Sequence, residues 1–338
     1  MNYLIQLVPH ANIRYREAIA ALGAAELRCM LQSAGIDAEV SDCTLGGASF
    51  LSFACGALDE GALRLLRGHS AALLLFERQG GLLRPLEVTP PAYLTGDLPE
   101  VLKYKGKTST TFTRLMLNCA RAASGFAAAP GPLTVLDPMC GKATTCFCAL
   151  ERGWNAIGAD VDAPALREAD TYMAKHLQLH RLKHRREALS LTVRGQGVPV
   201  TRYVLSDTRE HYAQGDTRFL HLCLSDAARA DALCRKTPPH LIVADLPYGV
   251  QHAPVAGQRP EPFEQLLRRA LPAWYRALLP GGALALSFNT LTLPRDRLLA
   301  LVAEAGFVPL TGSPWEGFRH FVEQAVLRDL VIALRRDS

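Results

Sequence analysis

The stretch TVLDPMCGKATT, residues 134–145, has the pattern of a strand that runs through a tight turn into a helix. The apolar run ends at Asp137, Gly141 gives the turn its conformational freedom, and residues 143–148 open a helix. In a doubly wound sheet, ligands bind at such a turn, outside the carboxyl ends of the strands. An ordinary strand-to-helix turn is the alternative. The spacing matches neither the dinucleotide motif GxGxxG nor a P-loop.

The alternation of strand, glycine-bearing turn and helix continues toward the carboxyl terminus. Candidate strands are the apolar runs at residues 133–136, 156–159, 203–205, 241–244 and 283–288. Strands that alternate with helices predict an α/β fold with a parallel sheet and helices on both faces. GFVPL and DLVIAL, residues 306–310 and 329–334, leave no room for a crossover helix, which predicts an antiparallel edge hairpin.

Residues 1–95 have a different pattern. They predict a small α+β unit, with helical spacing at 14–34 and 58–68 and strand-like runs at 3–8, 38–40, 49–54 and 71–76. The candidate linker is VTPPAYLTGDLP, residues 88–99, because tandem prolines forbid helix and discourage a central strand. We therefore expect two domains, residues 1–95 and residues 96–338.

Acidic residues follow several of the predicted strands. Asp160 comes about twenty residues after the first turn, where an acid accepts hydrogen bonds from ribose hydroxyls in other nucleoside-binding sheets. Asp162 has a competing role as a helix cap before Pro164, since proline suits the first helical turn. Asp207 follows the strand at 203–205 and has two open interpretations: contact with an adenine amino group, or a cap for the next turn.

The stretch VADLPYGV, residues 243–250, gives the strongest indication of chemistry. Asp245 ends a buried-looking strand, and Pro247 restricts Leu246 to an extended conformation that aims its carbonyl at the same point. Two acceptors can then hold one amino group, while Tyr248 offers a flat face for a base, a contact worth roughly 1–3 kcal/mol. An exocyclic base nitrogen is a poor nucleophile. Placing it in line with a sulfonium methyl group would supply much of the rate acceleration of methyl transfer. The stretch therefore predicts methyl transfer to such a nitrogen. The alternative chemistry, attack of a cysteine on a ring carbon, would need a thiol near this stretch, and there is none.

Three motifs in this order resemble the class I S-adenosylmethionine-dependent methyltransferases of the RNA guanosine-N2 family, whose members often carry a THUMP domain: DPMCG at 137–141, GADVD at 158–162 and DLPYG at 245–249. The similarity covers residues 100–338, including KYKGKTSTTFTRLMLN at 103–118. It implies a Rossmann-like, mostly parallel seven-stranded sheet and S-adenosylmethionine as cofactor. Implied cofactor contacts are Asp137, Pro138, Cys140, Gly141, Asp160, Val161 and Asp207. Implied catalytic contacts with the target base are Asp245, Leu246, Pro247 and Tyr248.

The resemblance implies guanine N2 in transfer RNA as the target. Adenine N6 in DNA or RNA is the alternative target, because Asp/Asn-x-Pro-Tyr also serves that chemistry, and a non-catalytic RNA-binding protein with this fold is a third interpretation. Residues 1–95 resemble the amino-terminal half of transfer-RNA guanosine methyltransferases that act at the base of the D arm. This implies an RNA-binding or THUMP-like accessory role. The sequence departs from the family at Lys142 and Ala143, where a small residue and a glycine are usual, so the loop is expected to be narrower.

Composition limits the class of protein. The 338 residues, 49% of them hydrophobic, can bury a full core, and no apolar run reaches the roughly 18 residues of a membrane span. The amino terminus has no cleavable apolar segment, so we expect a cytoplasmic protein without a membrane partner. The nine cysteines form no CxxC pair, which predicts reduced thiols and no metal site.

The net charge of +5 is compatible with a polyanionic partner, here RNA. The basic stretch KHLQLHRLKHRR, residues 175–186, contains no acid. It has two interpretations, a solvated helix face or a track for RNA phosphates. The sequence leaves open whether the protein needs an activating partner subunit.

Overall fold

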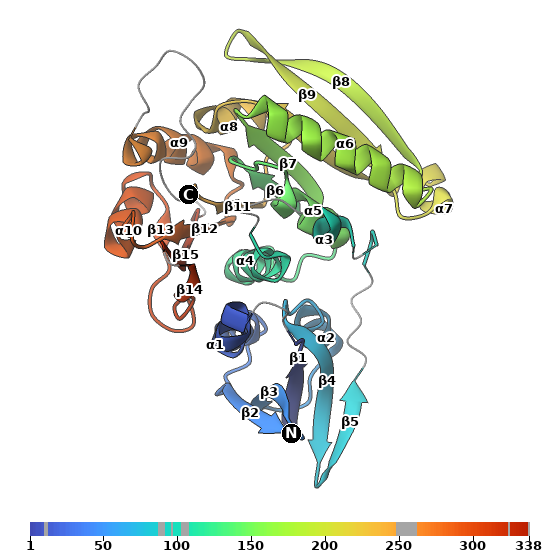
Figure 1. Cartoon of the computed structure of the whole chain (residues 1–338), viewed down its shortest axis with the longest axis vertical. Helices are drawn as coiled ribbons and strands as arrows, with labels where there is room; N and C mark the ends of the chain where they lie inside the picture. Colours follow the sequence, from blue (N-terminus) through green and yellow to red (C-terminus); the bar gives the residue numbers. More distant parts are fainter. Residues whose placement is uncertain are drawn as a thin grey trace.

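The computed structural model describes residues 1–9, 13–86, 92–95, 97–102, 108–247, 262–323 and 325–336. These residues form two β-sheets, and the smaller sheet lies below the larger one in Figure 1. Among them, no helix is both long and apolar enough to cross a membrane.

The smaller sheet is antiparallel, with strand order β2-β3-β1-β4-β5. Its part of the chain contains β1 (Asn2–Leu7), α1 (Ile13–Ser33), β2 (Ser41–Leu45), β3 (Ala48–Ala54), α2 (Glu60–Leu66), β4 (Ala72–Gln79) and β5 (Leu82–Leu86). The prediction of a strand at 38–40 is wrong, because the strand starts only at Ser41. β5 was not predicted, because this edge strand is exposed and carries Pro85.

The larger sheet has ten strands in the order β13-β15-β12-β11-β6-β7-β10-β9-β8, with β14 paired to β15. Its strands are β6 (Thr134–Asp137), β7 (Asn155–Asp160), β8 (His184–Val193), β9 (Gln196–Leu205), β10 (Arg218–Leu224), β11 (Leu241–Asp245), β12 (Ala283–Asn289), β13 (Val308–Pro309), β14 (His320–Glu323) and β15 (Val326–Leu334). The central strands β12, β11, β6, β7 and β10 are parallel. Together with β15 and β13 they form the predicted seven-stranded, mostly parallel sheet.

Helices cover both faces of this sheet, as predicted. The helices are α3 (Leu98–Val101), α4 (Thr110–Ala123), α5 (Thr144–Glu151), α6 (Ala163–Leu179), α7 (Arg209–Ala213), the 3₁₀ turn η1 (Ala227–Arg229), α8 (Ala230–Leu233), α9 (Phe263–Ala277) and α10 (Arg295–Glu304). Alternate strand residues enter separate cores: Val135 packs with α4, α5 and α6, and Leu136 packs with α8, α9 and α10. The predicted α/β, Rossmann-like fold is therefore confirmed.

The structure adds to the prediction at both edges of the sheet. As predicted, β13 and β15 pair antiparallel, but β15 lies between β12 and β13, and its hairpin partner in sequence is β14. At the other edge, β8 and β9 form a long antiparallel hairpin (Figure 1). β10, which the sequence did not reveal, is the outermost parallel strand and pairs with this hairpin through β9. Its polar His221 interrupts the apolar run that would have marked a buried strand.

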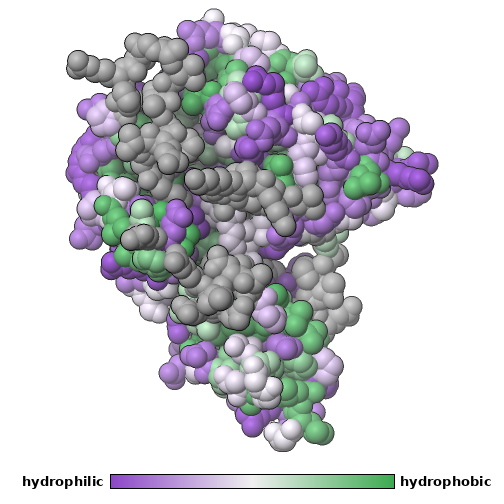
Figure 2. All heavy atoms as spheres, in the orientation of Figure 1, coloured by the Kyte–Doolittle hydropathy of each residue, from purple (hydrophilic) through white to green (hydrophobic). Residues whose placement is uncertain are grey.

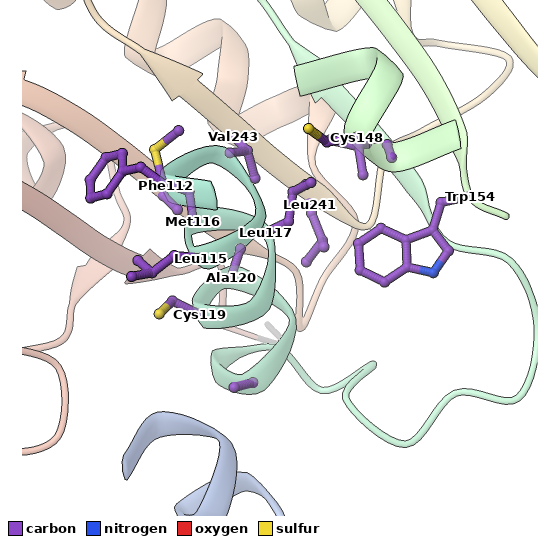
Figure 3. Packing of buried hydrophobic residues seen from close by; sticks show 14 of the residues in the cluster. Phe112, Leu115, Met116, Leu117, Cys119, Ala120, Cys148, Trp154, Leu241 and Val243 are labelled. Carbon is purple, nitrogen blue, oxygen red and sulfur yellow. The ribbon is translucent and has the colours of Figure 1, made fainter. Parts of the chain in front are cut away.

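Helix α4 connects the cores of the two sheets. Its apolar residues pack toward Leu241 and Val243 of β11, while α1 contacts it from the other side (Figure 3). At this boundary the fully buried Glu26 accepts hydrogen bonds from the Ser70 backbone N–H (2.8 Å) and from the Asn118 amide. A buried carboxylate is tolerated only with such donors. The division at residues 95 and 96 stays a prediction, because one hydrophobic cluster runs through both parts.

Candidate active site

The carboxyl ends of the five parallel strands form one edge of the larger sheet. Asp137 ends β6, Asp160 ends β7 and Asp245 ends β11, so the structure brings three of the predicted site residues to this edge. After β6 the chain adds β7 and the strands beyond it on one side of β6, and it then crosses to add β11 on the other side. Such a switch point is where open α/β sheets bind ligands. Asp137 and Asp245 flank it.

The loop after β6 is held against β7 by backbone hydrogen bonds. The Cys140 N–H donates to the Ala159 carbonyl (3.0 Å), and the Gly141 N–H donates to Asp160 Oδ2 (2.7 Å). Gly141 has φ +50° and Ala143 has φ +66°, the left-handed region that favours glycine. Ala143, which stands where the family usually has a glycine, therefore adopts a backbone conformation that is unfavourable for a residue with a Cβ. Pro138 and Cys140 belong to the same loop, and Cys140 is buried.

Asp160 connects two loops of the candidate site. Besides the Gly141 bond, its Oδ1 accepts the N–H of Asp162 at 2.9 Å. Asp162 in turn caps α6 by accepting the Ala165 N–H at 3.0 Å, the role expected of it. Between the two acids, Val161 is 58% exposed. An exposed apolar side chain beside a carboxylate suits a ligand that has both a flat ring and hydroxyl groups.

Asp137 is buried, with 3% of its surface exposed. Burial raises the pKa of Asp137 to about 7; hydrogen bonds from Thr145 and the Met139 N–H act against this rise, and the charges of Asp160 and Asp245 add to it. A cationic ligand beside this carboxyl group would lower its raised pKa and so stabilise the ionised carboxylate.

Asp245 is held by two residues that the motif did not reveal. Thr108, just before α4, and Arg328, in β15, both donate to its Oδ2; the Arg328 Nη2 lies 3.5 Å away. Both donors are buried, and the Arg328 guanidinium carbon lies 5.1 Å from the centre of the Phe112 ring. Arg328 left no sequence signal, because it follows Asp245 by 83 positions and comes from an antiparallel strand. Thr108 belongs to the segment 103–118 that the family resemblance had marked, of which residues 103–107 lie outside the described residues.

The rest of the DLPY motif is only partly described. The Leu246 N–H donates to the Ser287 carbonyl of β12 at 2.9 Å, and the Leu246 side chain is buried. This anchors the chain where it leaves β11 toward Pro247, which is partly buried. Tyr248 lies outside the described residues, so its predicted stacking role stays a prediction.

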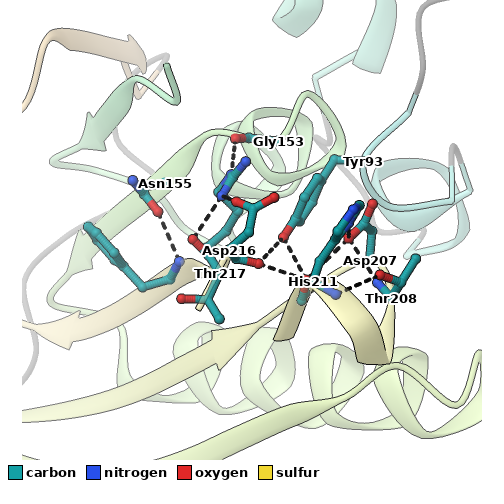
Figure 4. A network of polar contacts seen from close by, with 11 residues as sticks. Tyr93, Gly153, Asn155, Asp207, Thr208, His211, Asp216 and Thr217 are labelled. Carbon is teal, nitrogen blue, oxygen red and sulfur yellow. Dashed lines mark hydrogen bonds and ion pairs between the residues drawn. The ribbon is translucent and has the colours of Figure 1, made fainter. Parts of the chain in front are cut away.

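The expected place of Asp207 is wrong. β9 runs antiparallel to β10, with Leu205 opposite Arg218, so Asp207 lies at the amino edge of the parallel strands. There it accepts hydrogen bonds from the Thr208 N–H and His211 Nδ1, both at 2.8 Å (Figure 4). Against the effect of burial, these bonds lower the pKa of Asp207. Of the two open interpretations, the structure supports the one in which Asp207 orders the following turn.

Ser225 and Asp226 occupy the position that Asp207 was expected to have. They follow β10, which is parallel to β7, and the Ser225 N–H donates to the Asp160 carbonyl at 2.9 Å. Asp226 accepts the Ala228 N–H (2.8 Å) and pairs with Arg269 Nη1 (2.9 Å). The sequence did contain a signal, because both β9 and β10 end in Leu-Ser-Asp.

One group among the described residues could hold a metal ion, and it lies away from this edge. Asp97, His176 and His180 each place one ligand atom within 4.8 Å of the others. His180 Nε2 lies 3.2 Å from Asp97 Oδ2, and His176 Nε2 lies 3.2 Å from Thr95 Oγ1, so both histidine nitrogens already have a partner within the protein. The expectation of no metal site came from the cysteines and did not consider this cluster.

Comparison with known proteins finds no matching family model and no matching curated protein. Among solved structures, TrmN from Thermus thermophilus aligns with 99% of this chain and 100% of its own, at 15% identity and a TM-score of 0.44. The rRNA methyltransferase aviRa from Streptomyces viridochromogenes aligns with 68% of this chain and 87% of its own, at 15% identity and a TM-score of 0.39. A TehB-like SAM-dependent methyltransferase from Corynebacterium glutamicum aligns with 62% and 84%, at 15% identity and a TM-score of 0.36. Because these similarities are weak, the function has to follow from the residues of this chain.

Proposed function

We propose that this protein is an S-adenosylmethionine-dependent methyltransferase that acts on an exocyclic amino group of a nucleobase in RNA. One observation carries the proposal: Asp137 and the Asp245–Leu246–Pro247 segment flank the switch point of the sheet, and Asp160 lies on the adjacent strand. A ligand at the switch point would therefore contact both the turn assigned to a cofactor and the acceptors assigned to a base.

The residues present fit the cofactor. Asp160 would accept hydrogen bonds from the ribose hydroxyls, and the exposed Val161 beside it would contact the adenine ring. Asp226 is at the end of the next parallel strand, and we assign to it the adenine-side contact first predicted for Asp207. The buried carboxyl of Asp137 suits the positively charged methionine end. When bound, the cofactor supplies an electrophilic methyl group on sulfur.

The role of Asp245 is to hold the target amino group as a hydrogen-bond acceptor. Thr108 and Arg328 donate to the same carboxylate oxygen, which fixes the orientation of the carboxylate before the substrate binds. Leu246, anchored to β12 through its N–H, directs its carbonyl as the second acceptor. These two contacts would draw electron density toward the nitrogen and hold it in line with the methyl group. Tyr248 would stack on the base.

We propose guanine N2 in transfer RNA as the target, on the strength of the DLPYG motif at 245–249. Residues 1–95 would then be an accessory RNA-binding unit. Adenine N6 remains the alternative target, since the same pair of acceptors can hold either amino group. No observation on the described residues favours adenine.

Analysis of nucleosides tests this proposal. The purified protein would be incubated with unmodified transfer RNA and S-adenosylmethionine carrying a labelled methyl group, and the RNA then digested to nucleosides. We expect labelled N2-methylguanosine. Labelled N6-methyladenosine would support the alternative target. Binding of RNA without any labelled nucleoside would identify a non-catalytic RNA-binding protein and contradict the proposal.

A further inference from the structure

A cavity of about 800 Å³ lies at the amino edge of the larger sheet, between the end of α6, the start of β8 and α7. The described residues that line it include Arg181, Lys183, His184, Arg209 and Tyr212, and none of them is acidic. This part of the molecule presents a mostly hydrophilic surface, at the right of Figure 2. The predicted basic stretch 175–186 is therefore not one helix face, because α6 ends at Leu179 and β8 begins at His184.

The cations in and around this stretch include two groups with different surroundings. Arg185 pairs with Glu187 at 3.2 Å, and Arg186 pairs with Asp170 at 2.6 Å, so their charges are compensated within the protein. The charges of the three cations that line the cavity are not compensated in this way. Within the part of the chain that the structure describes, no carboxylate lies within ion-pairing distance of Arg181, Lys183 or Arg209. The positive electrostatic potentials of these three cations therefore add at the opening of the cavity.

Stabilisation of the helices does not explain this cluster. Cations near the end of α6 interact favourably with the helix carbonyls, which would account for Arg181 and Lys183. Arg209, however, is the first residue of α7, where a positive charge is unfavourable to a helix. The cavity also contains an aromatic surface, because the Lys183 Nζ lies 6.0 Å from the centre of the Tyr212 ring. Cations around an aromatic ring are typical of sites for nucleic acid.

We propose that this cavity binds backbone phosphates of the RNA substrate, at a distance from the reacting base; this proposal rests on the proposed RNA methyltransferase function. β11 and β7, with five and six residues, span roughly 17–20 Å between the two edges of the sheet. A folded RNA can span that distance. The carboxylates at the carboxyl edge of the sheet repel phosphates. Contacts with the RNA backbone are therefore expected at the basic cavity.

The test compares two triple variants that remove the same charge. Arg181→Ala, Lys183→Ala and Arg209→Ala together empty the cavity of cations, whereas Arg185→Ala, Arg268→Ala and Arg276→Ala remove three cations that are paired with carboxylates. Binding of unmodified transfer RNA would be measured by fluorescence anisotropy at several salt concentrations. We expect the first variant to raise the dissociation constant at least about tenfold and to lower the salt slope by about 2–3, at roughly 0.7–0.9 per phosphate contact.

The control variant should change neither quantity. An unchanged salt slope in the cavity variant would overturn the proposal, and so would an equal loss in the control, which would indicate a general effect of net charge. If the cavity variant loses affinity for inorganic phosphate but not for RNA, the cavity serves a small anion and the proposal is also overturned. The single change Arg209→Glu, on an exposed side chain, repeats the test should the triple variant fold poorly.

Methylation assays separate this proposal from the proposed function. At saturating RNA, the cavity variant should methylate at the unaltered rate, with the effect confined to KM. Loss of RNA binding in the cavity variant of a protein that methylates nothing would support the cavity and contradict the methyltransferase. Methylation with unaltered RNA affinity would support the methyltransferase and contradict the cavity.

Discussion

The candidate sites at the two edges of the larger sheet differ in charge. At the carboxyl edge the strand ends place Asp137, Asp160 and Asp245 around the switch point. At the amino edge, where Asp207 also lies, Arg181 and Lys183 line a cavity whose described lining residues include no acid. Acidic strand ends suit a cofactor with cationic groups, and a basic cavity suits phosphates. The comparison suggests that one sheet can separate the binding of a cofactor from the binding of an RNA backbone.

Asp160 and Asp207 provide the largest expected difference between the edges. Asp160→Ala should weaken S-adenosylmethionine binding by about 1.5–3 kcal/mol, roughly 10- to 150-fold, because a charged hydrogen-bond acceptor for ribose is lost. Asp207→Ala should leave cofactor affinity unaltered, because Asp207 lies at the other edge. Calorimetry on both variants, with thermal melts to confirm folding, makes the comparison. Equal losses would show that the assignment of the edges is wrong.

A smaller effect concerns the protonation of Asp137. Its pKa of about 7 means that the carboxyl must lose a proton before it can pair with the cofactor's ammonium group. Affinity for S-adenosylmethionine should therefore fall by about tenfold for each pH unit below 7 and level off above it. Asp137→Asn should flatten this profile between pH 5 and 7. A profile that remains steep in the variant would assign the titration to another group.

Much of the fold was predictable because its signals are local. The end of β6, the turn at Gly141 and the buried run of β11 each follow from a few adjacent residues. The parallel sheet then follows from the alternation of elements. Asp160 and Asp245 could be placed because each directly ends a recognisable strand.

The failures have a topological cause. Leu-Ser-Asp occurs at the ends of both β9 and β10, and only strand direction decides which aspartate faces the cofactor edge. The β8–β9 hairpin reverses that direction for Asp207, and no local pattern shows this. Arg328 could not be found for a similar reason, since its contact with Asp245 depends on how β15 inserts beside β12.

The most direct test of the central claim is single-turnover methylation of purified transfer RNA by Asp245→Ala. If Asp245 holds the target amino group, the rate should fall roughly 100-fold or more while RNA and cofactor affinities stay nearly unchanged, as expected when a preorganised transition-state contact is removed. Asp245→Asn should be milder, because an amide oxygen can still accept a hydrogen bond. A near-normal rate for Asp245→Ala, in a protein with an unaltered thermal melt, would contradict the catalytic role of Asp245 and the function that we propose.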